Sequence, residues 1–254
     1  MTGSMSERLR RIRSESRAAW YSFVRRRTAV FFTFFFPVII IGIFGALVET
    51  NPAGGLFSEP QGFYIPGYLA VVVLLTPLSR VGSTVARHRS NRRFEKLATT
   101  PLTRFEWLAA HTLVTTVLIG LASAVILGVL VLATGARFRV TPLLGVFVVV
   151  GVVTFCGLGA LLGRLADSQD GVIAVSNAVG IPMLFLAETF VTPEMLPSAF
   201  HPVIDFLPLT YFSRGVRAVT YPPASGSPMT DLGILFAVAL GFFVAGGYLV
   251  PWKE

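Results

Sequence analysis

The sequence has little charge for its length and almost no cysteine. Only 13% of its 254 residues are charged, while 54% are hydrophobic, and soluble domains hold roughly a quarter charged residues. A single cysteine, Cys156, excludes an intrachain disulfide framework and a cysteine-based zinc site, and we expect it to be a small buried hydrophobic residue. A soluble protein would have to hide several apolar runs of about 20 residues in one small domain. We therefore predict an integral membrane protein.

Sequence motifs for nucleotide, hydrolase or metal chemistry are also missing. The chain has no G-x-x-x-x-G-K-[ST] loop to hold a phosphate and no G-x-S-x-G turn for a nucleophilic serine. Its three histidines, His88, His111 and His201, are far apart in the sequence and share no ligand spacing with carboxylates. We expect no catalytic residue, no bound cofactor and no metal site in this chain.

Apolar runs predict an all-α integral membrane protein with about six transmembrane helices. An N-terminal segment, residues 1–27, precedes a single six-helix membrane domain over residues 28–250. The predicted spans are residues 28–48, 63–85, 105–133, 141–162, 171–187 and 231–250. Repeated prolines in the outer segment 188–228 prevent one continuous helix there, so we expect re-entrant or interfacial helices before the last span.

Lysine and arginine fall almost entirely on one side of this topology. The inner segments hold 17 of the 21 basic residues, and the outer ones are Arg137, Arg139, Arg214 and Arg217. Loops rich in lysine and arginine lie on the cytoplasmic side of a membrane. We therefore predict a multi-pass protein of the cell membrane with both termini in the cytoplasm. The net charge of +8 therefore indicates contact with anionic membrane lipid and not with nucleic acid. We interpret Arg214 and Arg217 as anchors in the outer headgroups, with contact to an anionic substrate group as the alternative.

Residues 5–27 have the spacing of an amphipathic helix. Its apolar face consists of Leu9, Ile12, Ser16, Ala19, Trp20 and Phe23, and arginines occupy most of the remaining surface. A helix of this kind binds in the cytoplasmic headgroup layer of a membrane. The alternatives are a solvated run of charge and, for one end of the helix, a contact with a cytoplasmic partner.

Three segments, in order, resemble the permease subunits of type-2 ABC exporters. The first is the basic helix that leads into the Phe-rich run 31–37. The second lies in the first inner loop, 87–104, where Arg92-Arg93-Phe94-Glu95-Lys96-Leu97-Ala98-Thr99-Thr100-Pro101-Leu102 is similar to the family's Gly-Thr-x-Glu-x-Leu-x-x-Thr-Pro-Leu stretch. Here Arg92-Arg93 replaces the Gly-Thr pair. The third is the segment 207–217 before the last span, and the resemblance covers nearly the whole chain.

This resemblance implies a permease that works with two copies of a separate cytoplasmic ATPase subunit and with a second permease subunit, in a homodimer or a heterodimer. ATP and Mg would be bound by the ATPase, not by this chain. The first inner loop would form a short coupling helix, with the contact residues Arg92, Arg93, Phe94, Glu95, Lys96 and Leu97. The substrate would be a hydrophobic or amphipathic drug, lipid or glycan moved outward across the cell membrane.

Other interpretations stay open beside this one. The arginines of the loop also act as topology signals that contact anionic lipid. A membrane scaffold or an immunity-type protein would need no ATPase. A secondary carrier is disfavoured because acidic residues are almost absent from the centres of the predicted spans and no internal repeat is detectable. Gly151, Gly157, Gly159 and Gly163 are predicted to permit close helix packing, within the chain or across a dimer.

Overall fold

A computed structural model describes residues 5–49, 61–135, 138–190, 200–221 and 226–252, which are mainly helical. In chain order the first elements are α1 (Met5–Val24), α2 (Arg27–Glu49), the 3-10 helix η1 (Gln61–Tyr64) and α3 (Ile65–Ser90). The next are α4 (Arg93–Ala98), α5 (Arg104–Thr134) and α6 (Pro142–Leu165). The last are α7 (Gln169–Leu186), α8 (His201–Ile204), α9 (Pro208–Thr220) and α10 (Pro228–Leu249).

Five of these helices, α3, α5, α6, α7 and α10, are long and apolar enough to cross a bilayer. A sixth candidate is the pair of α1 and α2, which is bent by 82° at the break between the two helices. The prediction of an all-α membrane protein with about six spans is confirmed. The span predicted over residues 105–133 corresponds to α5 to within a residue at each end, whereas α3 continues to Ser90, five residues beyond the predicted end at 85.

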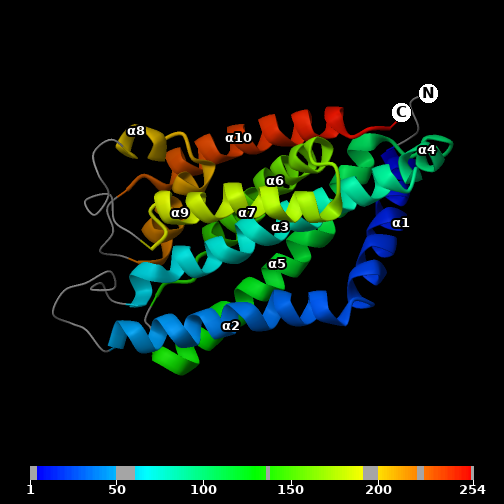
Figure 1. Cartoon of the computed structure of the whole chain (residues 1–254). Coiled ribbons are helices and arrows are strands. Elements are labelled where there is room, and N and C mark those ends of the chain that lie inside the picture. The colour runs from blue at the N-terminus through cyan, green and yellow to red at the C-terminus, as the bar shows by residue number, and fades with distance from the viewer. Residues whose placement is uncertain (1–4, 50–60, 136–137, 191–199, 222–225, 253–254) are drawn as a thin grey trace.

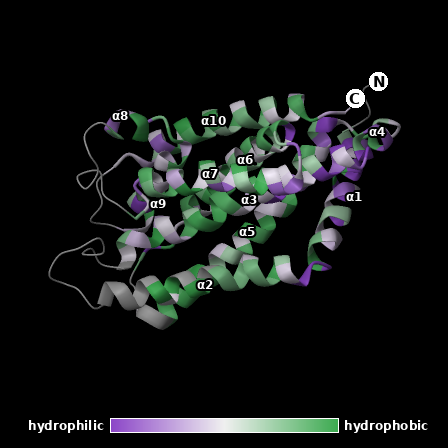
Figure 2. Cartoon of the chain, in the orientation of Figure 1, coloured by the Kyte–Doolittle hydropathy of each residue, from purple (hydrophilic) through white to green (hydrophobic). Residues whose placement is uncertain are grey.

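The long helices form a bundle around α3 and α6, which pack against each other (Figure 1). α6 also packs extensively on α10, and α3 packs on α7. α1 and the end of α10 lie on the side of α4 at one end of the bundle, whereas α8 lies at the opposite end (Figure 1). Figure 2 shows hydrophilic residues gathered around α1 and α4 and hydrophobic residues along the helices between the two ends. The bundle therefore has an apolar belt bounded by polar ends, as a bilayer requires.

Glycines on α6 let two neighbouring helices approach its backbone. A Cβ atom on Gly163 would lie 2.4 Å from the carbonyl oxygen of Gly82 on α3, and one on Gly157 would lie 2.5 Å from the carbonyl carbon of Phe242 on α10. All four glycines predicted to permit close packing would place an added Cβ atom within 3.0 Å of a neighbouring atom: Gly151, Gly157, Gly159 and Gly163. Their role in close helix packing is confirmed, and the partner helices belong to the same chain.

The apolar face of α1 packs on α5. Ala19 and Phe23 are buried against Val114 and Leu118 of α5, whereas Leu9, on the first turns of α1, is 60% exposed. The amphipathic helix is confirmed. The second half of this helix packs on the bundle through α5, and its position at the membrane surface stays a prediction.

The outer segment 188–228 contains two short helices in its described part, α8 and α9. Neither is long enough to cross a bilayer, in agreement with the prediction of interfacial or re-entrant helices. Pro208 occupies the first turn of α9. The N–H groups of a first turn have no partner within the helix, so this proline begins a helix and does not interrupt one. Residues 191–199 and 222–225 lie outside the described residues, as do Arg137 and Lys253.

Candidate functional site

The short helix α4 lies between two long helices and is defined by a sharp turn on each side. Arg92, which precedes it, has φ 50° and ψ 31°, a left-handed conformation that reverses the chain after α3. Beyond α4, the hydroxyl groups of Thr99 and Thr100 donate to the carbonyl oxygens of Lys96 and Leu97 at 2.8 and 2.7 Å. These bonds satisfy carbonyl groups that a helix end leaves without partners. α4 is therefore a separate element with its own ends.

Phe94 attaches α4 to the rest of the bundle. Its side chain is 2% exposed, and the centroid of its ring lies 5.3 Å from that of His88 on α3 and 5.1 Å from that of Trp107 on α5. The ring of Trp252, beyond α10, is 5.8 Å away. Aromatic pairs at such separations contribute about 0.5–1.5 kcal/mol each beyond the burial of their area. A displacement of α4 is thus transmitted to α3 and α5.

The remaining predicted site residues lie on the outside of α4. Those that are exposed or half-buried are Arg92, Arg93, Glu95, Lys96 and Leu97. Arg92 Nε is 4.0 Å from Glu95 Oε1, and the two side chains are 81% and 48% exposed. An ion pair this exposed contributes little to stability, so both groups are available to a partner. Phe94 points inward and positions this surface; it does not form part of it.

Glu106 caps the start of α5 and joins it to α1, and sequence analysis missed it. Its carboxylate accepts from the N–H of Thr103 at 2.9 Å, and the Thr103 hydroxyl accepts from the N–H of Glu106 at 3.2 Å. This reciprocal pair is a capping box, which the T-x-x-E spacing could have indicated. Both carboxylate oxygens also accept from the guanidinium group of Arg11 on α1, at 2.7 and 3.1 Å. No local pattern pairs residues so far apart in the sequence.

Two histidines that are distant in the sequence meet behind α4. The ring centroids of His88 and His111 are 6.3 Å apart, and His111 Nε2 lies 3.4 Å from a carboxylate oxygen of Glu15 on α1. Their separation in the sequence, 88 against 111, did not indicate that the fold brings these two rings and a carboxylate together. Among the described residues, no group of three His, Cys, Asp or Glu side chains is placed to hold a metal ion. Cys156 is buried, as predicted.

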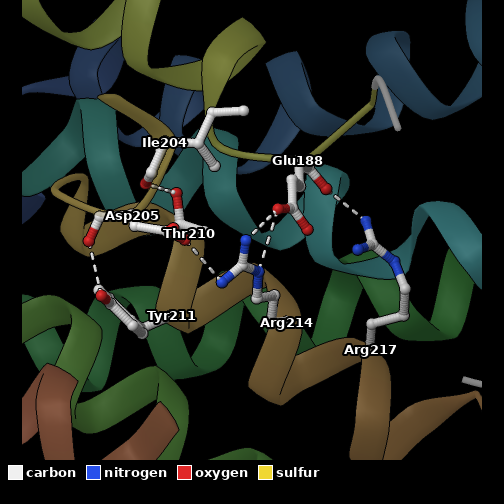
Figure 3. Close-up of polar contacts among 7 residues, drawn as sticks. All are labelled: Glu188, Ile204, Asp205, Thr210, Tyr211, Arg214 and Arg217. Atoms are coloured by element: carbon white, nitrogen blue, oxygen red, sulfur yellow. Dashed lines mark hydrogen bonds and ion pairs between the residues drawn. The ribbon is translucent and has the colours of Figure 1, made fainter. Parts of the chain in front are cut away.

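At the opposite end of the bundle, two arginines hold α9 (Figure 3). Arg214 donates from Nε and Nη2 to Oε1 of Glu188 at 3.0 and 2.5 Å, and from Nη1 to Asp205 Oδ1 at 3.0 Å. The hydrogen bonds to Glu188 raise the pKa of Arg214 above its usual range. Arg217 is 8% exposed; it donates to the backbone carbonyl of Glu188 and lies 4.2 Å from the ring centroid of Phe63.

These contacts correct the interpretation of Arg214 and Arg217 as headgroup anchors. Both guanidinium groups are bound within the chain, and that of Arg217 is buried. Glu188 follows α7 directly, so the two arginines attach α9 to the end of α7. Their role in the described structure is to stabilise the fold.

The fold is that of a multi-pass α-helical membrane protein, and α4 presents an exposed, charged surface at one end of its bundle. Sequence comparison gives its family. The model of the ABC-2 family transporter proteins matches residues 58–248. This match covers α3 to α10. The chain belongs to the ABC-2 family of transporter proteins, and it is a permease of this class.

Two relatives are similar over most of the chain. The daunorubicin resistance ABC transporter permease protein DrrB1 of Streptomyces coeruleorubidus is 26% identical over 213 residues, which cover 80% of this chain and 73% of that protein. The inner membrane transport permease YadH of Escherichia coli strain K12 is 21% identical over 247 residues, 93% of each chain. Both similarities extend beyond any single helix or loop, in agreement with a shared permease fold.

Proposed function

We propose that this chain is the membrane-spanning permease subunit of an ABC exporter. It moves a hydrophobic or amphipathic substrate, such as a drug, lipid or glycan, across the cell membrane with ATP hydrolysed by a separate ATPase subunit. ATP and Mg bind to that ATPase. The observation that carries the proposal is α4, an exposed charged helix fixed by Phe94 between two membrane-spanning helices.

The attachment of α4 makes it suitable for transmitting movement. Phe94 packs on residues of α3 and α5, and Glu106 at the start of α5 is bound to Arg11 of α1. A force on α4 therefore acts on three helices together and does not simply bend a loop. Closure of the ATPase on ATP would favour one arrangement of these helices over another, which is how a ligand shifts a conformational equilibrium.

The charge of the exposed surface indicates the character of the docking groove. Arg92, Arg93 and Lys96 carry three positive charges against one negative charge on Glu95, so the complementary groove of the ATPase is expected to be acidic. Leu97, half-buried on α4, would supply an apolar contact beside them. The complex would contain two ATPase subunits and a second permease subunit, either identical to this chain or different from it.

The proposed orientation places α4 and both chain ends in the cytoplasm. α1, α4 and the last described residues lie at the same end of the bundle (Figure 1), and the sequence segments assigned to this side hold 17 of the 21 basic residues. An excess of lysine and arginine on the cytoplasmic side supports this orientation. It also gives a cytoplasmic ATPase access to α4.

Co-purification with an ATPase tests the proposal. The full chain is expressed with a candidate ATP-binding cassette ATPase, extracted in mild detergent and compared with Glu95→Ala and Leu97→Asp. We expect a stable complex with stimulated ATP hydrolysis that both variants lose. Glu7→Ala, which removes the same charge from an exposed position on α1, should keep the complex. If the unaltered chain binds no such ATPase, the exporter proposal fails, and a scaffold or immunity-type role would replace it.

A further inference from the structure

A cavity of about 620 Å³ lies between α1, α2 and α3. This volume is in the range of small-molecule and lipid sites, about 300–1,000 Å³. One face of α3 forms a wall of the cavity. The lining residues on α3 come in adjacent pairs that repeat every four positions, from Val71 and Val72 to Arg87 and His88, and residues at this spacing lie on the same side of a helix. At a rise of 1.5 Å per residue, this face is about 25 Å long.

The cavity changes from apolar to cationic along this length. The residues at its apolar end are Phe32, Phe36, Val71, Val72 and Leu75. The residues that bring positive charge to the other end are Arg26, Arg80, Arg87 and Arg93. Among the described residues that line the cavity, Glu15 supplies the one carboxylate, and it faces His111 at 3.4 Å. The cationic end therefore holds more positive than negative charge.

Arg80 shows most clearly that the cationic end lacks a partner. Its Nε atom is buried without a hydrogen-bond partner in the described structure, and its Nη2 atom makes one long contact, 3.5 Å, with the carbonyl oxygen of Ala19. The guanidinium group lies 4.7 Å from the ring centroid of Phe23. Its electrostatic interactions with Arg26 and Arg87 are repulsive. A partly buried cation among like charges is destabilising unless an anion pairs with it.

We propose that this cavity binds an anionic phospholipid, with its phosphate among Arg26, Arg80 and Arg87 and an acyl chain against Phe32 and Phe36. Guanidinium groups bind phosphate oxygens through pairs of parallel hydrogen bonds. The length of the site also fits, because one leaflet with its headgroups is about 20–22 Å thick, half of the full bilayer. A lipid in this position would join the bent pair of α1 and α2 to α3. This binding does not depend on an ATPase, so it is separate from the proposed transport function.

Native mass spectrometry of the purified full chain in non-ionic detergent tests this site. The protein is titrated with phosphatidylglycerol or with phosphatidylcholine of identical acyl chains, and bound lipid is counted. We expect one phosphatidylglycerol to bind on the order of 100-fold more tightly than phosphatidylcholine, since each of three arginines near a lipid surface contributes about 1 kcal/mol, a factor of about five. Arg80→Gln and Arg87→Gln should each weaken phosphatidylglycerol binding about five- to tenfold and leave phosphatidylcholine binding unchanged.

Arg13→Gln is the matched control. Arg13 is exposed on α1 and does not line the cavity, so the same loss of charge there should leave lipid binding unchanged. Equal binding of the two lipids, or equal losses in Arg13→Gln and Arg80→Gln, would overturn the proposal. Displacement of the lipid by millimolar inorganic phosphate alone would also overturn it, because the site would then select a soluble anion. A thermal unfolding curve for each variant confirms that it is folded when its binding is measured.

Discussion

Removal of the Glu188 carboxylate is expected to loosen the end of the bundle at which α9 is held. The side chain of Glu188 is 7% exposed and that of its partner Arg214 is 37% exposed. Breaking a buried ion pair costs about 3–5 kcal/mol, whereas an exposed pair is worth about 0–1 kcal/mol. Arg214 keeps access to solvent and to Asp205, so we expect Glu188→Gln to destabilise the protein by about 2 kcal/mol.

The reverse substitution is expected to cost more. Arg214→Gln leaves the carboxylate of Glu188 buried without its cation, and we expect a loss of about 3 kcal/mol. The double variant, Glu188→Gln with Arg214→Gln, leaves neither charge unpaired. Its loss of stability should therefore be about 1–2 kcal/mol smaller than the sum of the two single losses. This asymmetry follows from the difference in exposure between the two partners.

Thermal unfolding in detergent at one fixed protein concentration measures these effects. A loss of about 2 kcal/mol corresponds to a Tm lowered by about 4–8 °C for a chain of this size. Asp205→Asn is the control, because its side chain is 62% exposed and its loss should cost less than about 1 kcal/mol. Unchanged Tm values for Glu188→Gln and Arg214→Gln, or an equal shift for Asp205→Asn, would refute this account of how α9 is held.

Three further predictions concern packing and the attachment of α4. Gly163→Ala should lower Tm, because the added Cβ would lie 2.4 Å from the α3 backbone. Gly145→Ala has no atom within 4 Å of the added Cβ, so it should raise Tm slightly, since alanine favours the helix more than glycine does. Thermal unfolding followed by fluorescence measures the direction of both Tm changes. Phe94→Ala should cost about 3–5 kcal/mol and abolish ATPase stimulation while membrane insertion persists, as an ATPase assay and membrane fractionation would show. Glu106→Gln keeps the capping box but loses the ion pair with Arg11, so trypsin should cleave α1 faster.

The membrane spans could be predicted from the sequence because the thickness of the bilayer fixes the length of an apolar run. The run predicted over residues 105–133 therefore gave the bounds of α5 to within a residue at each end. The face of α4 could not be predicted in the same way. A helix of six residues has no periodicity to read, and the inward direction of Phe94 depends on His88, Trp107 and Trp252, which come from three other segments.

The misinterpreted arginines illustrate a second limit. Charge counts along the chain predict the side of the membrane on which a segment lies, but not the contacts of a single side chain. Arg214 and Glu188 are 26 residues apart, and their pairing depends on how α9 folds back on the end of α7. The same holds for His88 and His111, which meet only because α3 and α5 pack together.

Site-specific photo-crosslinking in intact membranes tests the central claim, that α4 contacts an ATPase, most directly. A photoreactive phenylalanine analogue is placed at Lys96 on α4, or at Arg139, which is exposed near α9 at the other end of the bundle. The account predicts an adduct with the mass of one permease and one ATP-binding cassette subunit from position 96 and none from position 139. No adduct from position 96, or equal yields from both positions, would contradict it.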